Sequence, residues 1–225
     1  MNIAANLKHT REIIEESANA NNRTSEDIIL VAVTKTASTE EMQELIDLGV
    51  THVGESKVQE ITRKYEILGD QVKWHMIGHL QKNKVKYIVD KVEYIHSLDS
   101  YELALEIEKR AGRINRRVKC LMEVNISGEE SKYGLAPSAV KSMLEKFAEF
   151  QHVTIVGLMT MAPYVEDPEE TRQYFRGLKL LADEVRDMNL KNISMDYLSM
   201  GMSNDFQVAI EEGANMVRVG SKLFT

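Results

Sequence analysis

The chain has little of what marks secreted, membrane-spanning or nucleic-acid-binding proteins. It contains one cysteine and three prolines in 225 residues, which excludes an internal disulfide framework and proline-rich linkers. No stretch approaches the ~20 apolar residues that span a bilayer, and the N-terminal segment lacks the apolar core of a signal peptide. Acidic residues outnumber basic ones, 35 to 28, which argues against nucleic acid or an anionic membrane as the main partner. We expect a cytoplasmic monomer whose partner is a small molecule.

Apolar and charged residues are present in ordinary proportions, 43% and 28%. Such a composition is typical of a folded soluble protein and not of a disordered chain. The length suffices for one large domain with a substantial core. No linker-like segment interrupts the chain, so we expect a single domain over residues 1–225.

Short apolar runs alternate with amphipathic segments along the whole sequence. We expect strands at 28–36, 51–55, 72–78, 92–98, 118–126, 153–161, 197–201 and 215–220. Helices are expected at 2–22, 39–48, 56–68, 79–89, 99–112, 138–150, 167–188 and 204–212. Strict alternation indicates a parallel sheet, and eight repeats are the number that closes a (β/α)8 barrel. We therefore predict a TIM-type barrel with an extra N-terminal helix. A doubly wound open sheet is the alternative, but no GxGxxG motif follows the first strand.

Lys35 follows the first buried strand directly, just before the capping box that begins the next helix at Ser38. In a parallel barrel, reactive side chains gather at the carboxyl ends of the strands. We expect apolar neighbours to dehydrate this amine and make it a nucleophile toward carbonyl groups. The alternative is an ordinary strand-end lysine that points into solvent.

Two glycine–serine turns follow the last two strands, the position where such barrels often hold phosphate. Gly201 ends the expected seventh strand and Ser203 follows it closely, and Gly220 ends the eighth strand with Ser221 directly after it. Glycine permits close backbone approach, and a helix beginning at Asn204 would point free N–H groups at an anion. The pair of turns predicts a phosphate site, although each turn alone is also an ordinary strand-to-helix connection.

Arg218 lies inside the last strand, where a guanidinium needs a buried acceptor. A salt bridge within the barrel, to Glu55 or Glu123, is one interpretation. Donation to the ring or acid group of a ligand is the other. An amine, a phosphate site and a buried donor together suit an aldehyde that carries phosphate and a ring nitrogen, and pyridoxal 5'-phosphate (PLP) has all three groups.

Seven segments, in order, resemble the pyridoxal phosphate homeostasis proteins, whose barrel is similar to the N-terminal domain of alanine racemase. They are VAVTKT (31–36), GES-x-VQE (54–60), WHMIGHLQKNK (74–84), VNISGEESKYGL (124–135), GLMTMAP (157–163), LSMGMSNDF (198–206) and VRVGS (217–221). The resemblance implies a Schiff base between PLP and Lys35. It also implies a phosphate held by Ser203, Gly220 and Ser221, with Arg218 facing the pyridine nitrogen. A donor-only arginine there makes the cofactor a weak electron sink, which suits storage and transfer of PLP to other enzymes.

The chain departs from the family pattern in two places. Ser56 stands where the family usually has asparagine, so a polar contact made by that asparagine is replaced at most in part. The chain also stops at Thr225, earlier than the pattern suggests, so we expect a short last helix with the N-terminal helix covering the gap.

Several other residues allow competing interpretations. His75 and His79 have metal-ligand spacing but straddle a strand end, so we expect histidines at the rim of the barrel and no metal site. Lys132 is either a second aldehyde site or a solvated loop lysine. Cys120 lies in an apolar run and is expected to be a buried, inert thiol.

Two other functions remain open. An amino-acid racemase would need a second base opposite Lys35, and we find no evident tyrosine for that role. An aldolase without a cofactor would leave Arg218 without a function.

Overall fold

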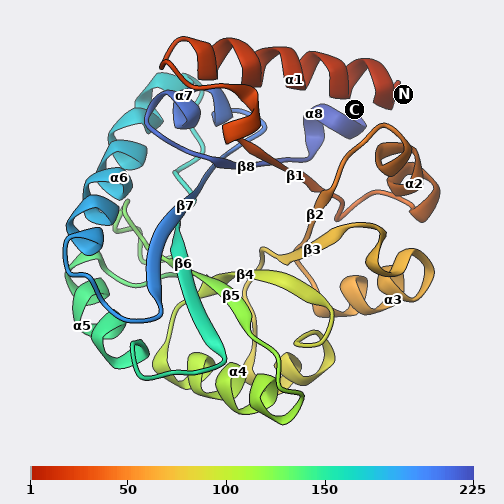
Figure 1. Cartoon of the computed structure of the whole chain (residues 1–225). Helices are drawn as coiled ribbons and strands as arrows, with labels where there is room; N and C mark the ends of the chain where they lie inside the picture. The colour runs from red at the N-terminus through yellow and green to blue at the C-terminus, as the bar shows by residue number, and fades with distance from the viewer. Residues whose placement is uncertain (1) are drawn as a thin grey trace.

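Eight parallel strands close into a barrel in the computed structural model, which describes residues 2–225 (Figure 1). The strands are β1 (Ile29–Val33), β2 (His52–Glu55), β3 (Lys73–Met76), β4 (Val92–Leu98), β5 (Val118–Glu123), β6 (Val153–Met159), β7 (Ile193–Met202) and β8 (Met216–Val219). Each strand pairs with the next one in the sequence, and β8 pairs with β1. The predicted TIM-type barrel is therefore confirmed, and the open-sheet alternative is wrong.

Helices surround the barrel on the outside (Figure 1). They are α1 (Ile3–Asn19), α2 (Thr39–Asp47), α3 (Val58–Leu68), α4 (Tyr101–Arg113), α5 (Pro137–Phe147), α6 (Arg172–Arg186), α7 (Phe206–Glu211) and α8 (Ser221–Phe224). Short 3₁₀ turns lie at η1 (Ser25–Asp27), η2 (Gly69–Gln71) and η4 (Pro168–Thr171). The predicted capping box is present, since Glu41 N–H donates to Ser38 Oγ and Ser38 N–H donates to the Glu41 carboxylate. Across residues 2–225, no helix has the length and apolar character needed to cross a membrane.

The expected α-helix over 79–89 is wrong. A 3₁₀ helix, η3 (Lys82–Tyr87), takes its place. Val85 and Ile88 are both fully buried, and a helix with three residues per turn brings side chains three apart onto one face. The short connection between β3 and β4 therefore buries both residues without a full α-helix.

The last helix is short, and α1 covers the gap beside it, as the sequence predicts. α8 has four residues, and Asn6 of α1 donates from Nδ2 to the carbonyls of Leu223 and Thr225, at 3.1 and 3.0 Å. Figure 1 shows α1 lying along α7 and α8, with the two ends of the chain close together.

Strand residues alternate between the inner wall of the barrel and the layer under the helices. Val31, Tyr94 and Met216 belong to an apolar cluster inside the barrel. Their outward-facing neighbours, Ala32 and Val217, pack in the core cluster that includes the helices. This alternation places Arg218, two residues after Met216, on the inner wall. Cys120 is fully buried in the outer cluster and burial raises the pKa of its thiol, which agrees with an inert residue.

Candidate functional site

The carboxyl ends of β7, β8 and β1 are adjacent because β8 pairs with both neighbours. Ala32 lies opposite Val219 in the register, so Gly220 reaches the end of the sheet beside Val33. A Cβ at Gly220 would lie 3.1 Å from both the Cβ and the carbonyl oxygen of Val33, so a larger residue would require Val33 to move by a few tenths of an ångström. The ends that carry Lys35, Ser203 and Ser221 are thus brought together, as predicted.

Lys35 is exposed in a turn two residues beyond the end of β1. The expectation that apolar neighbours dehydrate its amine is therefore wrong. The strand stops at Val33 and Thr34 is the last fully buried residue of the run, so the side chain of Lys35 begins above the packed wall.

The turn after β7 approaches the turn after β8 through a direct contact. The Gly220 N–H donates to Ser203 Oγ at 3.1 Å. Gly201 has φ of +88°, and a Cβ there would lie 2.5 Å from Ala209 Cβ and 2.8 Å from Phe206 Cα. The glycine therefore allows this turn to fold tightly onto α7.

Part of the predicted phosphate site is wrong. α7 begins at Phe206, not at Asn204, and the Asn204 amide donates to the Val165 carbonyl at 3.2 Å. The Asp205 carboxylate accepts the Met202 N–H at 2.6 Å, because this buried acid needs a donor at the turn. The remaining candidate donors are therefore those of Ser203 and of Ser221, the first residue of α8, while the Gly220 N–H is bonded to Ser203 Oγ.

Arg218 is buried on the inner wall and makes two hydrogen bonds with neutral groups. Nη1 donates to Ser199 Oγ at 2.5 Å, and Nη2 donates to the Thr160 carbonyl at 2.9 Å. Burial lowers the pKa of this guanidinium to about 10, so it remains charged at neutral pH. The proposed salt bridges with Glu55 or Glu123 are not among the hydrogen bonds and ion pairs of Arg218 in residues 2–225.

Glu123 instead lies buried at the end of β5, without neutralisation by a close cation. Burial, with a smaller contribution from the Asp99 charge, raises the pKa of Glu123 to about 7 while Arg218 opposes the shift. This carboxyl therefore changes its charge near neutral pH.

Glu55 pairs with a lysine that the sequence did not single out. Lys64 on α3 is fully buried and donates from Nζ to Glu55 Oε1 and to the Thr34 carbonyl, both at 2.7 Å. Thr34 Oγ1 also donates to Glu55 Oε1 at 2.6 Å. These hydrogen bonds among Lys64, Glu55 and Thr34 hold α3 against the residue that directly precedes Lys35. Lys64 occurs in the charged run TRKYE, which gives no local sign of burial.

Three histidines inside the barrel form a second feature that the sequence did not predict. His52, His75 and His96 occupy β2, β3 and β4 and are joined by ring-nitrogen contacts of 2.8 Å. His96 Nδ1 in turn lies 2.8 Å from Ser199 Oγ. The series therefore ends on the hydroxyl that accepts from Arg218.

The prediction that both His75 and His79 lie at the rim is correct only for His79. His79 is half-exposed beside Asp99, at 3.5 Å, and its ring stacks on Tyr133 with centroids 4.1 Å apart. His75 is fully buried because it points inward from β3. Among residues 2–225, no three His, Cys, Asp or Glu side chains are placed so that they could hold a metal ion together.

Lys132 and Ser56, singled out in the sequence, occupy different surroundings. Lys132 Nζ pairs with Glu129 Oε2 at 2.8 Å and donates to the Met161 carbonyl at 3.4 Å. The backbone of Ser56 packs against Gly78, where a Cβ would lie 2.4 Å from the Ser56 carbonyl oxygen. Lys132 is therefore held by an acid and by the end of β6.

Comparisons with known proteins agree with this geometry. The family model of the alanine racemase N-terminal domain matches residues 3–225. The pyridoxal phosphate homeostasis protein of Aquifex aeolicus is 44% identical over 225 residues, which cover 100% of this chain and 98% of that protein.

Solved structures show the same fold. PipY of Synechococcus elongatus PCC7942, in a structure with PLP bound, superposes with a TM-score of 0.82 at 32% identity. The match covers 95% of this chain and 100% of PipY. Alanine racemase of Clostridium difficile 630 has a TM-score of 0.79 at 16% identity, and the match covers 99% of this chain and 56% of that one. The latter similarity concerns the fold alone. From the full-length match, the barrel and the converging strand ends, this chain belongs to the pyridoxal phosphate homeostasis proteins of the alanine racemase N-terminal domain family.

Proposed function

We propose that the chain binds PLP through a Schiff base on Lys35 and serves to store the cofactor and transfer it to PLP-requiring enzymes, without strong catalysis of its own. The observation that carries the proposal is the adjacency of three strand ends. β8 lies between β1 and β7, so an amine, a donor-rich turn and a buried guanidinium belong to neighbouring strands. The PLP bound to the PipY relative supports the same ligand.

The residues present fit the chemical groups of PLP. Ser203 and Ser221 supply hydroxyl donors to a phosphate, and Ser221 adds a backbone N–H. Gly220 donates its own N–H to Ser203 Oγ, which leaves the proton of that hydroxyl free for the phosphate, and the glycine lets the backbone approach closely. Lys35 supplies the amine for the aldehyde, and its exposure gives the aldehyde free access. When bound, PLP supplies this aldehyde and a conjugated ring that withdraws electrons.

Arg218 favours storage over carbanion chemistry. Its hydrogen bonds to Ser199 and Thr160 use the terminal nitrogens, so we assign Nε–H as the donor to the pyridine nitrogen. Arginine has no acceptor and keeps its proton at neutral pH. A ring nitrogen that only accepts stays unprotonated, and the ring then withdraws electrons weakly.

The test combines colour, reduction and peptide mapping. Purified protein incubated with PLP is expected to absorb visible light. Borohydride should bleach the band and fix the cofactor mass on the peptide that contains Lys35. Lys35→Ala should lose the band and retain its melting temperature within a few degrees, because the exposed side chain contributes little to packing.

Lys57 provides the matched control, since it is also exposed and lies just after a strand end, that of β2. Lys57→Ala should keep the band and the labelled peptide. Labelling of another lysine, or a band that survives in Lys35→Ala, would refute the assignment. Racemisation of alanine or serine that depends on Lys35 would instead indicate an enzyme. A protein that does not bind PLP but is trapped by a phosphorylated sugar under borohydride would indicate an aldolase.

A further inference from the structure

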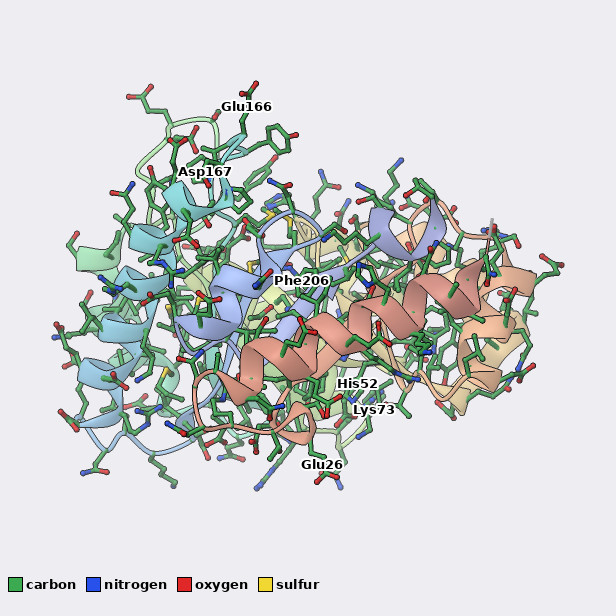
Figure 2. The ribbon with its side chains drawn as sticks, turned by 90° about the horizontal axis from the view of Figure 1, so that it is seen from above. Glu26, His52, Lys73, Glu166, Asp167 and Phe206 are labelled. Carbon is green, nitrogen blue, oxygen red and sulfur yellow. The ribbon has the colours of Figure 1, made fainter. Side chains whose placement is uncertain are left out.

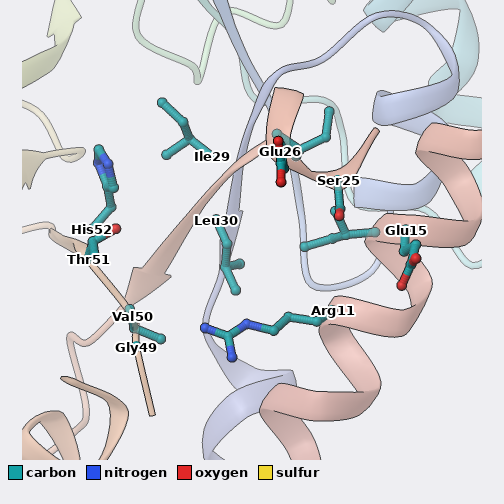
Figure 3. A pocket seen from close by; sticks show the side chains of 12 residues that line it. Arg11, Glu15, Ser25, Glu26, Ile29, Leu30, Gly49, Val50, Thr51 and His52 are labelled. Carbon is teal, nitrogen blue, oxygen red and sulfur yellow. The ribbon is translucent and has the colours of Figure 1, made fainter. Parts of the chain in front are cut away.

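The histidines inside the barrel connect Arg218 with the opposite end of the molecule. His52 is the first residue of β2 and lines a cavity of about 500 Å³ at the amino ends of the strands (Figure 3). Figure 2 shows His52 and Lys73 at the end of the barrel opposite to Glu166 and Asp167. From His52 the contacts run across β3 and β4 and then over the interior to β7 and β8.

The polarity of this series is determined at Arg218. A guanidinium nitrogen can only donate, so Ser199 Oγ accepts from Nη1. Ser199 is fully buried, and the other partner of its hydroxyl is His96 Nδ1. The hydroxyl proton must therefore point to His96, because any other arrangement leaves a buried donor without an acceptor.

The tautomer of each histidine then determines the tautomer of the next one in the series. Since His96 Nδ1 accepts, the proton of neutral His96 is on Nε2 and is donated to His75 Nδ1. His75 Nε2–H in turn donates to His52 Nδ1. His52 keeps its proton on Nε2, at the end of the series that borders the cavity. All three rings have the same tautomer, and every nitrogen within the series has a partner.

The surroundings keep the three rings neutral. Burial, together with like charge from the neighbouring histidines, holds the pKa of His75 well below its usual range. Burial and the Arg218 charge do the same for the pKa of His96. Burial and the Lys73 charge lower the pKa of His52 to about 4, with Glu93 opposing the shift.

We propose that His52, His75, His96 and Ser199 form one hydrogen-bond relay of fixed polarity, which positions Arg218 by turning the lone pairs of Ser199 toward its guanidinium. These four are positioning residues, and they act on the ligand only through Arg218. Their effect on PLP rests on the proposed function, but the polarity of the relay is a property of the ligand-free protein.

The first measurement is the tautomeric state of the histidines in ¹⁵N-labelled, ligand-free protein by NMR at pH 7. We expect His52, His75 and His96 to be neutral, with the proton on Nε2. A proton on Nδ1 of His75 or His96, or a charged ring at this pH, would overturn the relay as stated.

The second measurement replaces His52, at one end of the relay, and determines the tautomer of His96, near the other end. His52→Leu removes the acceptor of His75 Nε2–H, so one buried donor must lose its partner: His75 Nε2–H in the wild-type arrangement, or the Ser199 hydroxyl if the protons shift to Nδ1. His75 and then His96 should therefore become mixtures of the two tautomers. His52→Asn is the matched variant, because the amide oxygen takes the place of the accepting nitrogen and should preserve the wild-type tautomers. An unchanged His96 in His52→Leu would refute coupling along the series. If His52→Leu does not fold, Ser199→Ala tests the same point, since loss of the hydroxyl should leave His96 in a mixture of tautomers.

The ligand provides a separate readout. The absorption band of bound PLP should shift in His52→Leu and remain unchanged in His52→Asn, which a merely packing role of His52 would not produce. Failure of the wild-type protein to bind PLP would refute the proposed function and leave the tautomer result intact. A band that is identical in all variants, despite altered tautomers, would refute the positioning of Arg218.

Discussion

Replacing Lys64 by methionine removes the cation from the buried cluster of Lys64, Glu55 and Thr34, next to Lys35. Lys64 and Glu55 are both fully buried, with the charged atoms 2.7 Å apart. Methionine keeps most of the volume but leaves the Glu55 carboxylate without its cation and the Thr34 carbonyl without its donor. The second carboxylate oxygen of Glu55 has no partner among the described residues even in the wild-type protein, so little compensates the loss.

Breaking a buried ion pair from one side typically costs about 3–5 kcal/mol. For a chain of this length, each kcal/mol corresponds to a change in melting temperature of roughly 2–4 °C. Lys64→Met should therefore melt roughly 6–20 °C below the wild type. The free energy of unfolding, measured by urea titration with circular dichroism, should fall by the same 3–5 kcal/mol, about a fifth or more of a typical total.

A double-mutant cycle separates the ion pair from simple packing. Glu55→Gln combined with Lys64→Met removes both charges, so the double variant should lose less than the two single variants added together, by about 1–3 kcal/mol. Lys57→Met, at an exposed position, should change stability by less than about 0.5 kcal/mol. A loss below about 1 kcal/mol in Lys64→Met, or strict additivity in the cycle, would refute the reasoning.

Two further changes test the turn after β7 and the acid at the end of β5. Gly201→Ala should cost about 2–5 kcal/mol in urea unfolding, because a left-handed backbone costs ~1–2 kcal/mol and overpacking ~1–3 kcal/mol. Gly128→Ala has a similar φ of +72° but open space around it, so it should cost only about 1–2 kcal/mol; equal losses would contradict the clash. Because the pKa of Glu123 is about 7 in the folded protein and about 4.3 in an unfolded chain, the folded state binds the extra proton between these values, and stability falls as pH rises through this window. Glu123→Gln should remove this fall and exceed the wild type by about 3 kcal/mol at pH 8 but not at pH 4; parallel pH profiles of unfolding would contradict the assignment.

The order and type of the elements were largely predictable from the sequence. Buried parallel strands are continuous apolar runs, and helices show capping residues and amphipathic spacing, so both signals are local. The segment 79–89 shows where this reasoning fails, since Val85 and Ile88 fit a tighter helix that apolar spacing alone does not distinguish. The start of α7 was placed two residues too early, because the side chain of Asp205 bonds the Met202 N–H inside the turn.

The candidate site was predictable only as a set of strand ends. Lys35, Ser203 and Gly220 each follow a strand, and the closed barrel brings such ends to one face whatever the details of packing. The partners of Arg218 were not predictable, since they depend on which inner-wall residues meet across the barrel. The exposure of Lys35 agrees with the alternative of a strand-end lysine that points into solvent, but the sequence could not decide between the two, because it does not show where the packed wall ends.

By itself, then, the sequence determined the eight-fold repeat, its closure and the strand ends at which the candidate site residues lie, because hydrophobic periodicity and turn residues act over a few neighbours. Only the tertiary structure decided that Lys64 is buried against Glu55 and that His96 meets Ser199, 103 residues away. A polar side chain inside a barrel takes whichever partner the closed wall places within hydrogen-bond distance. That distance is set by barrel geometry and has no counterpart in the local pattern of the chain.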